Sequence, residues 1–212
     1  MVEILAATGG IALLAFAYFA MSRKPKFIAA IEYWIYIPGE ISPSQESLLK
    51  RLHENNPFGS SAFTKSEGLV FSDVRLHIAL VHRAKNPHTF RPDLFDSHIE
   101  PSPEILQLLS DSAAFVKIRF ISEEPLQSDV QLRFMPQLAA AIAFESNGGP
   151  IFDTVAEKLL RAEDFVEMYA QTKNLAAVEP HVSILWIDQA EGCRVETRGL
   201  VKKGLPEVVT DY

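Results

Sequence analysis

The stretch AAFVKIRFIS, residues 113–122, alternates its side chains between two faces with a period of two. One face consists of Val116, Ile118 and Phe120, and the other of Phe115, Lys117, Arg119 and Ile121. Successive side chains of a β-strand point to opposite faces, so this pattern predicts a strand with an apolar side in the core. It is the clearest strand signal in the chain.

The residues that follow predict the longest helix of the body. LRFMPQLAAAIAFES, residues 132–146, is rich in alanine, which has the highest helix propensity. Asn147-Gly148-Gly149 then supplies the left-handed conformations that end a helix. Pro136 is expected in the first turn, where a missing N–H does no harm.

Before this unit, three further strands and two helices are expected. FIAAIEYWIYIPGE (27–40) predicts a strand and a turn, residues 42–55 a helix capped by Ser42 or Ser44, and residues 69–73 and 74–83 strands. Residues 85–103 contain four prolines and little periodicity, which indicates an irregular join. A short helix over 102–112 should have Ser102 as its cap and Pro103 at its first position.

After the long helix, the pattern is less decisive. Residues 150–160 fit a strand, a hairpin or the start of a helix, residues 161–172 a helix, and residues 181–204 a hairpin that turns at Glu191-Gly192. This mixed order favours an α+β fold with a mixed or antiparallel sheet backed by helices. The join suggests two α+β halves, residues 28–84 and 104–212.

Composition limits the partners of this body. The chain has 212 residues and a net charge of −7, which disfavours a nucleic-acid surface because such surfaces are basic. Its single cysteine, Cys193, has no internal partner for a disulfide, and this suits a reducing compartment.

Residues 1–22 predict a transmembrane anchor. The 18 residues from Ile4 to Met21 carry no charge, and a helix of that length rises about 27 Å, close to the hydrocarbon thickness of a bilayer. A cleaved signal peptide fits less well, because Glu3 precedes the apolar run and the basic residues follow it. A helix buried in the globular core is the other alternative, although such a helix would normally show a polar stripe.

The basic juxtamembrane segment, residues 23–27, sets the expected orientation. Arg23, Lys24 and Lys26 should remain in the cytoplasm, with the N-terminus outside the inner membrane and the body cytoplasmic.

The apolar run also has small residues at helical spacing. These are Ala6, Thr8, Gly9, Gly10 and Ala12. Small residues four apart let a second membrane helix approach closely, although they are also common in any span. We therefore expect contact with other membrane subunits as well as with lipid.

No complete catalytic or cofactor motif is visible. Neither glycine-rich phosphate loop occurs, and no nucleophile with an assigned base was identified, so no cofactor is expected. The weak metal candidates lie in the proline-rich join and are His88, Asp93, Asp96 and His98. Imidazole and carboxylate are proper ligands, but a solvated loop explains them equally well.

Two stretches resemble a bacterial family of uncharacterised domains. They are QLAAAIAFESNGGPIFDTVAEKLLRAEDF (137–165) and ETRGLVKKGLPEV (196–208). In that family an alanine-rich helix is followed by a Gly-Gly turn and a strand carrying aspartate, and the chain closes with a T-x-G-L…G-x-P-E stretch. Lys203 departs from the aromatic residue often found there. The resemblance singles out Asp153 and Glu207, for which turn and hairpin roles are expected, and it implies no activity.

Together these features favour a non-enzymatic accessory or scaffolding subunit of a larger membrane complex. The layout is similar to that of the H subunit of bacterial photosynthetic reaction centres, by architecture alone. Two alternatives remain open: a membrane-tethered inhibitor or immunity-type protein whose acidic face binds a basic partner, and a metal-dependent enzyme using residues 88–98.

Overall fold

The computed structural model describes residues 29–54, 75–91, 99–172, 174, 176–188, 190 and 192–211. The predicted anchor, the basic segment and the strand expected at 69–73 lie outside these ranges. Within them, no helix is both long enough and apolar enough to cross a bilayer.

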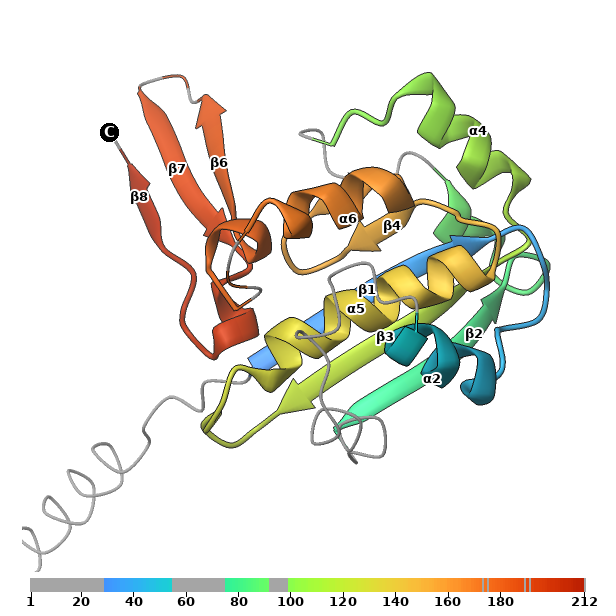
Figure 1. Cartoon of the computed structure of the whole chain (residues 1–212). Coiled ribbons are helices and arrows are strands. Elements are labelled where there is room, and N and C mark those ends of the chain that lie inside the picture. The colour runs from blue at the N-terminus through green and yellow to red at the C-terminus, as the bar shows by residue number, and fades with distance from the viewer. Residues whose placement is uncertain are drawn as a thin grey trace, which may run out of the picture.

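A five-stranded antiparallel sheet, the large sheet, forms the centre of the molecule (Figure 1). Its strands are β1 (Ala29–Ile37), β2 (Leu76–His82), β3 (Ala114–Ser122), β4 (Ile151–Asp153) and β5 (Lys158–Leu160). Their order is β2-β3-β1-β4-β5. The short pair β4 and β5 resolves the ambiguity at residues 150–160 in favour of a hairpin.

Helices cover both faces of the large sheet. The helices α2 (Gln45–Glu54), α5 (Val130–Glu145) and α6 (Ala162–Ala170) share a core with one face, and α4 (Pro103–Asp111) and the 3-10 helix η3 (Pro87–Phe90) pack on the other. The path β1-α2-β2-β3-α5-β4, with these strand neighbours, has the split β-α-β topology of the ferredoxin-like fold. The predicted α+β class is confirmed.

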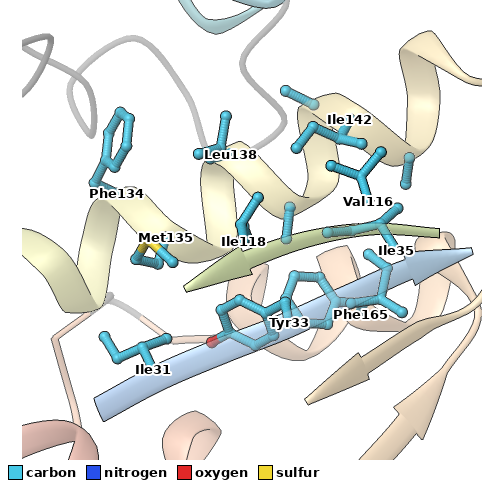
Figure 2. Close-up of a cluster of buried hydrophobic side chains, with 14 of the residues drawn as sticks. Ile31, Tyr33, Ile35, Val116, Ile118, Phe134, Met135, Leu138, Ile142 and Phe165 are labelled. Carbon is cyan, nitrogen blue, oxygen red and sulfur yellow. The ribbon is translucent and has the colours of Figure 1, made fainter. Parts of the chain in front are cut away.

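The main core lies between the large sheet and α5. Figure 2 shows Leu138 and Ile142 of α5 packed over Val116 and Ile118 of β3, which confirms the apolar face predicted for that strand. Because α5 also contacts α2 and α6, 12 of its 16 residues are buried. Its alanines allow this close approach on several sides.

Most helix ends match the sequence, with one exception. The Ser102 side chain accepts a hydrogen bond from the Ile105 N–H at 3.3 Å, as expected of a cap. Asn147 and Gly148 have φ angles of 64° and 57° and end α5. Pro136, however, stands in the second turn rather than the first, because α5 begins at Val130.

A separate three-stranded antiparallel sheet, the small sheet, ends the chain. Its strands are β6 (Ser183–Asp188), β7 (Cys193–Arg198) and β8 (Val209–Asp211), in that order. The predicted hairpin is confirmed as β6 and β7, whereas β8 was not predicted. Two 3-10 helices, η5 (Glu179–His181) and η6 (Leu200–Lys203), connect the small sheet to the body.

The sheets do not divide the chain at residues 85–103 as expected. The predicted first half contributes β1 and β2 to the large sheet, and the predicted second half contributes β3, β4 and β5. The physical reason is β3, which pairs along its length with both β1 and β2 and so joins the two regions in one sheet.

Gly149 provides a test of how closely β1 and the loop before β4 approach. A Cβ atom at Gly149 would overlap the carbonyl oxygen of Tyr36, next to the 3.0 Å bond from the Tyr36 N–H to the Pro150 carbonyl. We predict that Gly149→Ala lowers the free energy of unfolding by about 2 kcal/mol or more. Gly39→Ala is the matched control, because its Cβ meets no atom within 4 Å. Equal losses in denaturant titrations of the two variants would contradict this account.

Candidate interaction surface

The small sheet exposes large apolar side chains on one face. Trp186 is 72 % exposed and Ile184 is 63 % exposed, and both point to the same side of β6. Cross-strand pairing places Val195 of β7 and Thr210 of β8 in the same row as Trp186. We call this side the outer face; its residues are Ile184, Trp186, Asp188, Cys193, Val195, Thr197 and Thr210.

The opposite side of the small sheet, the inner face, carries a group of paired polar side chains beside the apolar Leu185, Ile187 and Val209. Glu196 is buried and accepts from Arg198 at 2.9 Å, with Arg194 at 3.5 Å. Arg198 also reaches Glu157 of the body at 3.2 Å. The Ser183 hydroxyl donates to the Ala156 carbonyl at 2.6 Å. This face therefore attaches the small sheet to the rest of the protein.

A half-buried lysine adds to this attachment. The Lys158 ammonium donates to the backbone carbonyls of Pro180 at 3.2 Å and Val182 at 3.0 Å, which ties β5 to the segment entering β6. Burial lowers the pKa of Lys158 because it disfavours the charged form. The hydrogen bonds to both carbonyls offset part of the free-energy cost of burying the charged ammonium.

A buried ion pair links the large sheet to the segment between β7 and β8. Lys202 of η6 is fully buried and donates to the Asp153 carboxylate at the end of β4. The other Asp153 oxygen accepts from the N–H groups of Val155 at 3.2 Å and Ala156 at 3.0 Å. Burial lowers the pKa of Lys202, while the Asp153 charge opposes that shift. Asp153 thus holds the turn after β4 through its backbone contacts and holds η6 through Lys202.

Two tyrosines and a histidine extend this interior network. The hydroxyls of Tyr33 and Tyr169 lie 3.1 Å apart, and the Tyr169 hydroxyl lies 3.3 Å from Nδ1 of His181. The Lys202 ammonium lies 5.4 Å from the centre of the Tyr33 ring. Burial raises the pKa of both tyrosines, because tyrosinate would be poorly solvated there. All five side chains of the network are almost completely buried, so it is positioned to stabilise the fold.

Glu207 holds the loop between β7 and β8. Its carboxylate accepts from the N–H groups of Gly199 at 2.8 Å and Val201 at 3.2 Å and from the Thr197 hydroxyl at 2.8 Å. Gly199 has a φ of 113°, and a Cβ there would overlap the His181 carbonyl oxygen. The polar residues singled out by the sequence, Asp153 and Glu207, therefore both form structural contacts.

The sequence did not identify the partners of those two residues. No role for Lys202 was predicted from the sequence, and nothing near Asp153 in the sequence indicates a partner 49 residues away. The only available signal was the resemblance itself, since its two stretches contain Asp153 and Lys202. The exposed Trp186 was assigned only to a hairpin.

The remaining site predictions are only partly covered by the structure. His88 lies exposed in η3, whereas Asp93, Asp96 and His98 fall outside the described residues, as do Ala6, Gly9, Gly10 and Ala12 and Arg23, Lys24 and Lys26. Among the residues that are described, no group of three or more histidine, cysteine or acidic side chains could hold a metal ion. Cys193 is a half-buried free thiol.

Comparison of the chain with known protein families, with characterised proteins and with solved structures finds no match.

The buried ion pair can be tested by removing one partner. We predict that Lys202→Met lowers the free energy of unfolding by about 3 kcal/mol or more, because Asp153 is left charged and buried. Lys203→Met, the half-exposed neighbour in the same 3-10 helix, should change it by about 0.5 kcal/mol at most.

A double variant separates the ion pair from general packing. Asp153→Asn combined with Lys202→Met removes both charges while keeping an oxygen acceptor for the two backbone N–H groups, so its loss should be smaller than the sum of the two single losses. Chemical denaturation measures all four variants. Strict additivity would show that the two side chains act independently.

Proposed function

We propose that this chain is a non-enzymatic accessory or scaffolding subunit of a larger membrane protein complex, and that the outer face of the small sheet contacts another subunit. The supporting observation is the distribution of exposed apolar side chains. Of the ten large ones exposed in the described part of the chain, seven lie from Val178 to Val209, and the two most exposed of these, Trp186 and Ile184, lie side by side on the outer face. Clustered apolar exposure of this kind marks protein interaction sites more often than scattered residues do.

Trp186 is the expected anchor of this contact. Tryptophan is enriched among the few interface residues that dominate binding energy, because it buries a large apolar area with little loss of side-chain freedom. Ile184 and Val195 lie beside it in the sheet and can exclude water around the indole. The small sheet is also held to the body by Lys202 and Lys158, so little ordering is needed upon binding.

A second function, a membrane-tethered inhibitor that binds a basic partner, is favoured by charge. Asp188 is the only charged side chain of the outer face, and the whole chain has a net charge of −7. Acidic surfaces accelerate association with basic partners, and this effect weakens with salt. Association that slows tenfold or more between low and high salt would favour the inhibitor, whereas salt-independent association would favour the scaffold.

The proposed location rests on residues 1–22 as an anchor and on Arg23, Lys24 and Lys26 as the cytoplasmic flank. Basic residues near a span remain on the cytoplasmic side, which gives an outside N-terminus and a cytoplasmic body. We predict that a reporter fused after Tyr212 is active only in the cytoplasm, in cells whose membrane fraction contains the chain. Reporter activity in the periplasm would contradict this orientation.

The docking role is tested by Trp186→Ser in the full chain, purified from native membranes with its associated proteins. We predict at least a tenfold loss of co-purifying partner, since truncation of an interface tryptophan removes about 2 kcal/mol or more of binding energy. Stability should change little, because the side chain is 72 % exposed.

Ile41→Ser is the matched control for this experiment. Ile41 is 84 % exposed but follows β1, away from the small sheet. Retention of the partner by Trp186→Ser, or equal loss in both variants, would contradict docking through the outer face.

A further inference from the structure

Strand β6 forms an unprotected edge of the small sheet. It pairs with β7 on one side, and the strand order β6-β7-β8 leaves its other side without a strand among the described residues. Such an edge presents backbone N–H and C=O groups that can pair with another strand. Proteins usually protect an edge with lysine, proline or a bulge, yet SILWID contains no lysine or proline and pairs with β7 in unbroken register.

The opposite edge of the small sheet is less suited to pairing. Strand β8 has three residues and ends at the charged Asp211, whereas β6 has six residues and carries charge only at its last position, Asp188. The first five residues of β6 are therefore free of charge. This makes β6 the edge to examine for strand addition.

We propose that β6 pairs antiparallel with β6 of a second copy of this chain, about a two-fold axis at Leu185. In an antiparallel pair, residues directly opposite each other lie on the same face. The two-fold axis must then pass midway between two copies of the same residue. The three registers nearest the middle of β6 are centred on Ile184, Leu185 and Trp186. The choice among them follows from the side chains.

Of these registers, only the one centred on Leu185 pairs both Ile184 and Trp186 with apolar side chains inside the strand. Centring on Leu185 places Ile184 opposite Trp186 of the second copy, twice by symmetry, and leaves Asp188 opposite Val182, beyond the start of the strand. Centring on Trp186 instead pairs the two Trp186 side chains with each other but places Ile184 opposite Asp188, an apolar group against a charge, twice by symmetry. Centring on Ile184 places Trp186 opposite Val182, outside the strand, and shortens the pairing. The self-complementarity of β6 about Leu185 is what favours a second copy as the occupant.

Electrostatic repulsion does not prevent this arrangement. In the Leu185 register the two Asp188 residues lie at opposite ends of the paired strands, about 20 Å apart at the rise of an extended chain. That distance exceeds the screening length of about 8 Å at physiological salt. The small sheets would join into one six-stranded sheet whose outer face contains both Trp186 side chains.

This inference goes beyond the proposed function, because it specifies two copies of the chain and a doubled outer face. It is tested by Leu185→Cys in a Cys193→Ser background, with the full chain in a non-ionic detergent under mild oxidation. The paired residues would lie about 5 Å apart, within disulfide reach, so a disulfide-linked dimer is expected. Ile187→Cys in the same background is the matched control, since its copies would lie about 14 Å apart and should not cross-link.

Sedimentation of the unmodified chain gives an independent measurement that does not depend on how the cysteine variants fold. The expected protein mass is twice the 23.6 kDa of the chain. A monomer at all concentrations up to about 100 µM, or cross-linking of Ile187→Cys as efficient as that of Leu185→Cys, would overturn the proposal. No partner protein is present in these measurements, so their failure leaves docking by Trp186 intact, and loss of docking leaves the dimer intact.

Discussion

The ion pair between Lys202 and Asp153 is the contact on which the arrangement of the two sheets depends. Strand β4, next to the edge strand β5 of the large sheet, carries the aspartate, and η6, between β7 and β8, carries the lysine. Burying two charges is unfavourable unless their geometry and additional hydrogen bonds compensate. Here two backbone N–H groups donate to the second Asp153 oxygen, so both oxygens of this carboxylate have hydrogen-bond donors.

The small sheet needs such a link because it lacks a core of its own. Three strands of six, six and three residues are near the lower limit for an independent sheet, and the outer face leaves Trp186 and Ile184 in solvent. Its stability therefore comes from its inner face and connections: Glu196 with its arginines, the lysine contacts, and the loop held by Glu207. An exposed apolar surface on a small sheet can persist because polar contacts fix the sheet from the other side.

The sequence predicted the local elements better than their assembly. The alternation around Val116 and Ile118 located β3, and Ser102-Pro103 located the start of α4, because both signals depend on neighbours in the chain. Strand order depends on long-range pairing, so the central position of β3 between β1 and β2 could not be read from any one segment. β8 was missed because three residues are too few to show a period. Trp186 was read as an ordinary strand residue, since exposure follows from what the fold leaves uncovered.

The buried ion pair and the exposed outer face of the small sheet are physically connected. Lys202 has no exposure, yet it fixes η6, which follows β7 after Gly199 and is joined to β8 by residues 204–208. A surface that is held in place before binding loses little conformational entropy when a partner arrives. The apolar outer face would be an aggregation hazard on a loosely attached hairpin. On a sheet anchored by buried charge it becomes a defined surface with one orientation, and this is the physical basis for proposing that it binds a partner.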